Sequence, residues 1–246
     1  MYAPEHPPTQ AVIMAGGKGT RLQPYTYVLP KPLVPLGERP ILEFILRKLA
    51  AAGLTQVTIA LGYKAQILMA VIGDGERFGL NINYYIEEQP LGTMGALALL
   101  DNLADNFLVM NGDICTDMDF ADFFCSHTAS NNELTVASYL REERLELGVL
   151  DLDEGKERII GFREKPTLDL WVSMGIYGLR KSALQHIPQH TFFGFDTLMH
   201  TLLGKKQPVG SYPFRGRWHD IGRPDDYALV QDLYAAQGDG IFGLTP

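Results

Sequence analysis

The sequence predicts an α/β fold, in which a Rossmann-like, doubly wound, mostly parallel mixed sheet is flanked by helices. Three observations predict it. Short apolar runs have the pattern of strands that are buried on both faces of a sheet. Segments with apolar residues on one helical side separate these runs in the first half of the chain. In the second half, strand-like segments follow one another with fewer helices, which indicates a mixed sheet.

The first half alternates strands with helices. Residues 11–15 form an apolar run that stops at Gly16, as expected for a buried parallel strand. Residues 40–52 place apolar side chains on one side of a helix, which Gly53 ends. Further strands are predicted at 57–61, 82–86 and 107–110, and further helices at 65–72 and 94–103. This alternation predicts right-handed βαβ units.

The second half is expected to complete the same domain. Its predicted elements are a helix at 120–127, strands at 134–140, 149–152, 158–163 and 172–179, and closing helices at 195–203 and 225–235. No linker or repeat divides the chain, so we expect one domain over residues 9–240 with tails at 1–8 and 241–246. Residues 9–118 and residues 119–240 would be the two halves of this domain, with an active site between them.

Composition excludes some classes of protein. The 246 residues carry a net charge of −8, which argues against a general nucleic-acid or membrane-surface binder but leaves room for a small basic pocket. Two cysteines, Cys115 and Cys125, indicate a reducing compartment without disulfides. The polar N-terminus has no signal-peptide core and no later run is long enough to span a bilayer, so we expect a soluble, cytoplasmic protein.

A glycine-rich loop follows the first strand, at residues 16–24 with the sequence GGKGTRLQP. Glycines let backbone N–H groups approach phosphate oxygens, and an arginine grips a phosphate through two hydrogen bonds. The Walker A pattern fails because Gly19 follows Lys18, and the dinucleotide fingerprint fails because Leu22 replaces its third glycine. A tight strand-to-helix connection is an equally good interpretation of the loop taken alone.

Two further segments suit phosphate and metal chemistry. Lys31 lies between two prolines, which fix the backbone around a cation, although a proline-rich surface loop is the alternative. Asp113 follows the strand at 107–110 and should lie at its carboxyl end, where ligands of open α/β sheets bind. The segment Asn111-Gly112-Asp113 also suits an Asx turn. The aromatic run at 192–195 is interpreted as core packing, with a lid or an oligomer contact as alternatives.

Taken in order, these motifs resemble the sugar-phosphate nucleotidylyltransferases, also called nucleotide-sugar pyrophosphorylases. The resemblance rests on the glycine loop with Lys31-Pro32, the segment EQPLGTMGA at 88–96, Asn111-Gly112-Asp113, Glu164-Lys165-Pro166, and WHDIG at 218–222. It covers the chain from about the first strand to the last helix. Segments 40–43, 90–93 and 218–227 look most like the mannose-1-phosphate guanylyltransferase branch.

The resemblance implies that residues 9–118 are a nucleotide-binding half and residues 119–240 a sugar-phosphate-binding half, and it implies a site and a reaction. The nucleotide would contact Ala15, Gly16, Gly17, Gly19, Thr20, Glu88 and Gly92, and the catalytic cations would be Arg21, Lys31 and Lys165. The sugar phosphate would contact Asn111, Gly148, Glu164, Lys165 and Ser173. The metal ligands would be Asp113 and Asp220. Mg²⁺ is the implied cofactor, since it takes one or two carboxylates plus substrate phosphates. An NTP, GTP by preference, would react with a sugar 1-phosphate to give a nucleotide sugar and pyrophosphate.

Alternatives remain at this stage. Uridylyl- and thymidylyltransferases are similar enough to compete with the guanylyltransferase interpretation, and a catalytically silent homologue that binds nucleotide sugars is a third class. Many family members carry asparagine where this chain has Ser173, which leaves recognition of the sugar hydroxyls open. The chain ends soon after the last helix, so we expect no appended β-helix domain. A homo-oligomer is compatible with the sequence.

Overall fold

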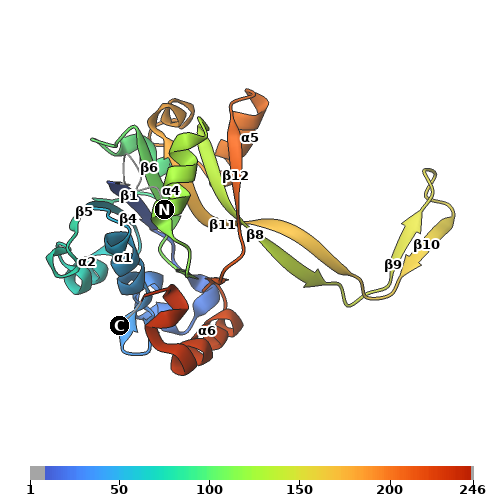
Figure 1. Cartoon of the computed structure of the whole chain (residues 1–246), viewed down its shortest axis with the longest axis horizontal. Helices are drawn as coiled ribbons and strands as arrows, with labels where there is room; N and C mark the ends of the chain where they lie inside the picture. The colour runs from blue at the N-terminus through green and yellow to red at the C-terminus, as the bar shows by residue number, and fades with distance from the viewer. Residues whose placement is uncertain (1–8, 245–246) are drawn as a thin grey trace.

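A seven-stranded sheet forms the centre of the protein in a computed structural model that describes residues 9–244 (Figure 1). In spatial order its strands are β12 (Val209–Phe214), β8 (Leu134–Arg144), β11 (Thr167–Arg180), β6 (Asn106–Asn111), β1 (Gln10–Ala15), β4 (Gln56–Leu61) and β5 (Asn81–Ile86). Only β11 runs antiparallel to its two neighbours, while the other pairs are parallel. The predicted mostly parallel mixed sheet is therefore confirmed.

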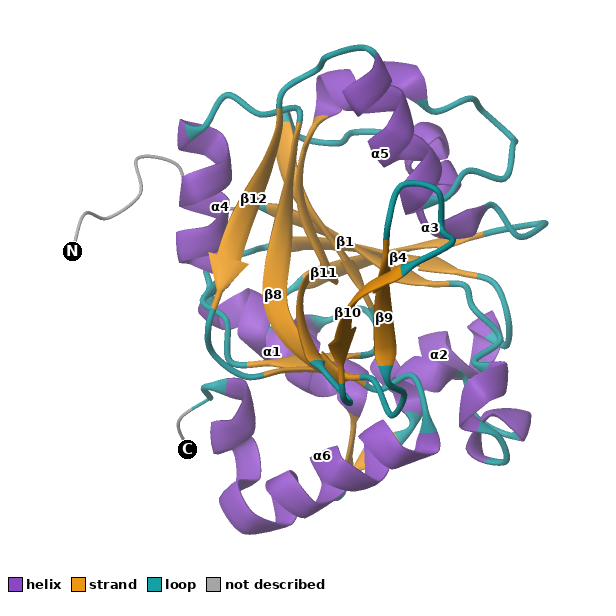
Figure 2. Ribbon diagram, turned by 90° about the vertical axis from the view of Figure 1, so that its right-hand side faces the viewer, coloured by secondary structure: helices purple, strands orange, loops and turns teal. Residues whose placement is uncertain are grey.

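Helices cover both faces of this sheet (Figure 2). The helices α1 (Ile41–Ala51), α2 (Ala65–Ile72), α4 (Phe120–Ala129) and α6 (Pro224–Gln237) pack into one apolar cluster, and α3 (Gly92–Gly95) and α5 (Phe195–Gly204) into the other. Along β1, Ala11 and Ile13 face the first cluster and Val12 faces the second, because successive strand residues point to opposite faces. Within residues 9–244, none of these helices has the length and hydropathy needed to cross a membrane.

Some elements differ from the predicted ones. The helix predicted at 94–103 is a single turn, α3, followed by a 3₁₀ turn at Ala96–Leu99, and the chain becomes extended at Leu100. The strand β12 was not predicted, since it contains Pro213 and lies at the sheet edge, where proline is tolerated. The short strands β7 (Ile114–Thr116) and β13 (Trp218–Asp220) were not predicted either, since each has only three residues.

A long two-stranded arm projects from the sheet (Figure 1). The strands β8 and β11 stay paired from Leu134↔Leu179 to Arg144↔Thr167, well beyond the predicted strands. The pair β9 (Val149–Leu152) and β10 (Ile159–Arg163) continues the arm to its tip. We define the arm as residues 139–172. At its base the register of β11 shifts between Ser173 and Tyr177.

The packed core extends beyond the predicted domain end at residue 240. A 3₁₀ turn at Gly238–Phe242 follows α6 and places the fully buried Phe242 ring on Phe44, with 4.4 Å between ring centroids. The Lys48 ammonium donates a hydrogen bond to the Phe242 carbonyl. Residues 241–244 of the predicted C-terminal tail are thus described, whereas the predicted tail at 1–8 and residues 245–246 lie outside the described residues.

Replacing Phe242 tests whether this C-terminal turn belongs to the core. Because Phe242→Ala removes a fully buried ring, we expect the free energy of unfolding to fall by about 3–5 kcal/mol. Leu229→Ala on the half-exposed side of α6 is the control and should cost less than about 1 kcal/mol. Urea unfolding followed by circular dichroism measures both, and equal losses would contradict a core that reaches Phe242.

Candidate active site

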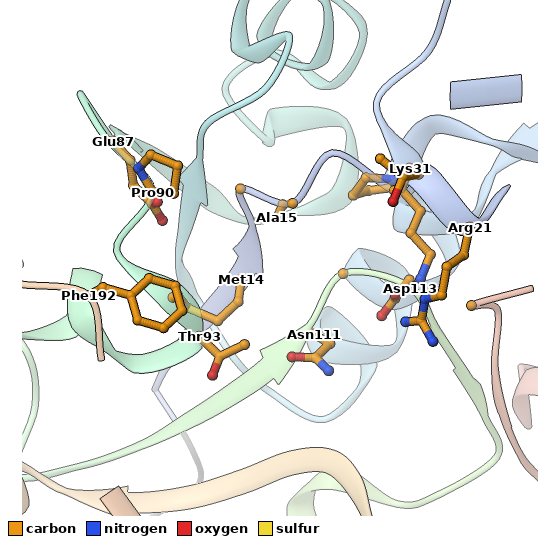
Figure 3. A pocket seen from close by; sticks show the side chains of 18 residues that line it. Met14, Ala15, Arg21, Lys31, Glu87, Pro90, Thr93, Asn111, Asp113 and Phe192 are labelled. Atoms are coloured by element: carbon orange, nitrogen blue, oxygen red, sulfur yellow. Dashed lines mark hydrogen bonds and ion pairs between the residues drawn. The ribbon is translucent and has the colours of Figure 1, made fainter. Parts of the chain in front are cut away.

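One pocket of about 440 Å³ opens where the parallel strands β1 and β6 end. The carboxyl ends of parallel strands are the usual ligand site of open α/β sheets. Ten of the predicted site residues line this pocket: Ala15, Gly16, Gly17, Gly19, Thr20, Arg21, Lys31, Gly92, Asn111 and Asp113. Segments that are far apart in the chain therefore meet around one cavity (Figure 3).

The glycine-rich loop forms one wall of the pocket. Gly19 has a φ of +61°, and a Cβ atom there would approach the Thr26 methyl group to 2.9 Å and the Lys31 Cβ to 3.0 Å. The Thr26 hydroxyl donates a hydrogen bond of 2.9 Å to the Gly19 carbonyl. Within the loop the chain forms a single 3₁₀ turn at Thr20–Leu22. The loop conformation thus depends on Gly19 and Thr26 and not on a long following helix.

Lys31 and Asp113 line the charged end of the pocket, and Asp220 lies next to Lys31 without itself being a lining residue. Lys31 belongs to a 3₁₀ turn, Lys31–Leu33, whose other two residues are buried. Its neighbour Pro32 lies against Gly112, where a Cβ atom would come within 3.2 Å of the proline ring. This packing holds the Lys31 ammonium in contact with the Asp113 carboxylate, and 3.9 Å from the Asp220 carboxylate.

Strand pairing brings Asp220 to Asp113. The strand β13 pairs antiparallel with β7, and Asp220 lies opposite Ile114, the residue after Asp113. The Ile221 N–H group donates to the Asp113 carbonyl at 3.1 Å. The Trp218 indole N–H donates to the Met174 carbonyl at 3.0 Å, which fixes the start of β13. Asp220 thus reaches the charged end of the pocket from a segment more than a hundred residues away.

The two carboxylates fit a magnesium ion. The Oδ1 atom of Asp113 is buried and, among residues 9–244, has no hydrogen-bond partner. Partial burial, and then the negative charge of Asp113, raise the pKa of the Asp220 carboxyl, while Lys31 and Arg21 oppose that rise. No group of three or more potential metal-binding side chains occurs among the described residues. Two carboxylates with a free oxygen are what Mg²⁺ needs when phosphates supply its remaining ligands.

The opposite end of the pocket contains Glu87, Pro90, Thr93 and Phe192 (Figure 3). One Glu87 oxygen accepts the Leu91 N–H group at 3.1 Å, and burial raises the pKa of this carboxyl. Glu88, predicted as the base contact, is exposed and does not line the pocket. The Glu87 N–H group still donates to the Leu61 carbonyl of β4, so the chain remains strand-like just after β5. Consecutive strand side chains point in opposite directions, and the side chains of Glu87 and Glu88 therefore separate.

Phe192 is a lining residue that the sequence interpretation assigned to core packing. The neighbouring Phe193 is 8% exposed and belongs to the core, whereas Phe192 is 69% exposed at the pocket rim. Backbone bonds from Met94 and Gly95 to the Phe193 carbonyl hold this segment over α3. The signal was available in the sequence, because two consecutive side chains of an extended segment point in opposite directions.

The predicted sugar-phosphate residues divide between two places. Asn111 lines the pocket, and Ser173 lies at the base of the arm, where its hydroxyl accepts the Gly175 N–H group. Gly148, Glu164 and Lys165 lie in the arm, outside the pocket lining. There Lys165 pairs with Glu146 at 3.3 Å. The structure therefore does not bring the arm residues to the pocket of the same chain.

The chain is similar in sequence to proteins named mannose-1-phosphate guanyltransferase. The chain is 32% identical to a mannose-1-phosphate guanyltransferase of Yarrowia lipolytica and 35% identical to one of Schizosaccharomyces pombe, each over 92% of this chain and 64% of the relative. It thus spans less than two thirds of the length of these relatives. The crystal structure of HddC from Yersinia pseudotuberculosis superimposes with a TM-score of 0.73 and 25% identity, over 92% of this chain and 99% of that one.

A family model supports the same grouping over nearly the whole chain. The model described as "Nucleotidyl transferase" matches residues 10–237, from the first strand of the sheet to the end of α6. This range includes the glycine-rich loop, Lys31, Asp113 and Asp220. The chain belongs to the nucleotidyl transferase family.

Proposed function

We propose that the protein transfers a nucleotidyl group from an NTP to a sugar 1-phosphate and releases pyrophosphate. The preferred substrates are GTP and mannose 1-phosphate or a related hexose or heptose 1-phosphate. One observation carries the proposal: the pocket has a cationic, carboxylate-lined end that suits phosphates and an opposite end with one half-buried carboxylate, Glu87, that suits a base. The names of the relatives from Yarrowia lipolytica and Schizosaccharomyces pombe agree with it.

The residues at the charged end would position phosphates for in-line attack. Backbone N–H groups of the glycine loop would face the triphosphate, and Arg21 at the rim would neutralise the departing pyrophosphate. Lys31, next to Asp113, would also neutralise phosphate charge. Asp113 and Asp220 would hold Mg²⁺, which when bound withdraws charge from the phosphate oxygens. No protein nucleophile is required, because such transfers depend mainly on positioning and on charge neutralisation.

The carboxylate at the opposite end favours guanine. A carboxylate only accepts hydrogen bonds, and guanine is the base whose pairing edge offers two adjacent donors, N1–H and the 2-amino group. Uracil and thymine offer one donor between two acceptors. One oxygen of Glu87 already accepts Leu91 N–H, which fixes the carboxylate while leaving its other oxygen for the base. A uridylyl- or thymidylyltransferase remains the second candidate, with the silent nucleotide-sugar-binding homologue as the third.

The sugar phosphate would be held by Asn111 in the pocket and by Gly148, Glu164 and Lys165 of an arm, with Ser173 at the base of the arm. Glu164 would accept hydrogen bonds from sugar hydroxyls, and Lys165 would orient the attacking phosphate oxygen. We further propose that the protein works in the cytoplasm as a homo-oligomer, because the arm exposes large apolar side chains that a second copy could cover.

Pyrophosphate release tests the reaction directly. Five NTPs (GTP, UTP, dTTP, CTP and ATP) are crossed with a panel of sugar 1-phosphates in the presence of Mg²⁺, with EDTA as the control. We expect GTP with mannose 1-phosphate or a related heptose 1-phosphate to give the highest kcat/KM, and EDTA to abolish turnover. Binding of nucleotide sugars without turnover of any pair would instead favour the silent homologue.

Removing either carboxylate tests the metal site. Asp113→Asn and Asp220→Asn should each lower kcat at least about 100-fold, because phosphate charge would no longer be neutralised at the reacting centre. Mg²⁺-dependent protection of the fold by a non-hydrolysable GTP analogue should disappear in both variants, which provides a readout besides turnover. Asp225→Asn, an exposed carboxylate on α6, is the matched control. Near-normal rates in the site variants would contradict the assignment.

Glu87→Gln tests base recognition. An amide presents a donor where guanine needs an acceptor, so kcat/KM for GTP should fall by about 10- to 100-fold, the usual cost of a lost charged hydrogen bond. The rates with UTP or dTTP should change much less. Glu88→Gln replaces the exposed neighbour and should leave the preference for GTP unchanged. An equal loss with every NTP would mean that Glu87 supports the loop and does not read the base.

A further inference from the structure

The arm carries Glu164 and Lys165 away from the pocket that needs them. Beyond the pair Ser138↔Ser173, six more residues of β8 lead to the pair Arg144↔Thr167, and Lys165 lies just past it. At about 3.3 Å per residue, this ladder holds Lys165 about 20 Å from Ser173. Figure 1 shows the arm leaving the body of the protein with no other element beside it. Under the proposed function, the pocket of one chain therefore lacks two of its sugar-phosphate residues.

The arm also exposes many large apolar side chains among its charged ones. Ten large apolar side chains in or near its two strands and its tip are exposed: Leu140, Leu145, Leu147, Leu150, Leu152, Ile159, Ile160, Phe162, Leu170 and Trp171. The charged side chains pair with one another along the arm, as in Arg141 with Glu143 and Arg163 with Asp151. Large exposed apolar side chains that gather on one projecting segment often mark a protein–protein contact.

The body of the same chain is poorly placed to cover the arm. Both arm strands are direct continuations of central strands, and β8 and β11 remain paired on both sides of the bulge at Ser173–Tyr177. The ladder resumes directly beyond this bulge, so in the structure the arm continues the sheet and lies away from its own pocket (Figure 1). A second copy of the chain can meet the arm where it stands.

Exposed aromatic and aliphatic side chains also lie on segments next to the pocket. Tyr25, Tyr27 and Val28 are exposed, and their segment is tied to the glycine loop through Thr26. Phe192 is exposed on the other side of the pocket. These exposed apolar side chains beside a charged pocket suit an arm whose apolar side chains flank Glu164 and Lys165. The arm, residues 139–172, has 34 residues, slightly more than the ~20–30 that one side of a stable interface contributes.

We propose that the arm of each chain closes over the pocket of a second copy, so that Glu164 and Lys165 complete the sugar-phosphate site of the partner. A two-fold axis makes the exchange reciprocal and closes the assembly as a dimer with two arm-to-pocket contacts. The catalytic part of this inference rests on the proposed function. Its structural part does not, since the apolar arm requires cover whatever the substrate.

Mixing two inactive variants tests the exchange of residues between copies. Arg21→Ala disables the pocket and Lys165→Ala disables the arm, and both side chains are exposed, so both variants should fold. Each alone should lose activity at least about 100-fold. Coexpressed in equal amounts with different tags, they should recover about one quarter of the wild-type rate, because half of the dimers are mixed and each mixed dimer has one intact site. Mixed dimers without recovery would overturn the proposal.

Sedimentation velocity tests the interface without any substrate. The wild-type chain should sediment as a dimer, and Leu147→Asp with Ile160→Asp, both on exposed arm positions, should sediment as a monomer. Leu203→Asp places the same charge on an exposed apolar position of α5 and should remain dimeric. A monomeric wild type, or an arm variant that stays dimeric, would overturn the proposal. An arm-dependent dimer that turns over no NTP would instead refute the proposed function alone.

Discussion

The contact between Lys31 and Asp113 is the interaction on which the pocket depends. Two carboxylates that lie together and partly buried repel each other, and one lysine offsets only one of their two charges. The turn that carries Lys31 is held by the packing of Pro32 on Gly112, which links the proline-flanked segment to the end of β6. The remaining negative charge and the unpartnered Asp113 oxygen leave the site prepared for a cation and for phosphates.

Periodicity in the sequence was sufficient for the central sheet and for the residues that directly follow its strands. The apolar run before Gly16 and the one before Asp113 are both strands of the parallel part, and both lead into the pocket. These positions could be predicted because a buried strand delivers the next residue to the carboxyl edge of the sheet. The family resemblance added Asp220, which no local pattern could have placed beside Asp113.

The remaining features depend on tertiary contacts that a sequence does not display. The β7–β13 pairing consists of three residues on each strand, too few for a periodic signal. The choice between Glu87 and Glu88 depends on the strand parity of β5, and a shift of one residue reverses it. The strands at the tip of the arm were predicted, but the continuation of β8 into the arm was not, because the charged residues 141–144 resemble a solvated loop. The apolar residues of the arm therefore gave no indication of where they point.

The single antiparallel strand has a mechanical consequence. The strand β11 begins in the arm, passes the bulge at Ser173 and then lies against β6, with Ile176 opposite Met110. At the bulge, Gly175 approaches the Asn111 amide so closely that a Cβ atom would lie 2.6 Å from its nitrogen. One continuous strand, β11, thus joins the arm to the part of the pocket that contains Asn111. A force that bends or twists the arm is transmitted along β11 to the side chain of Asn111.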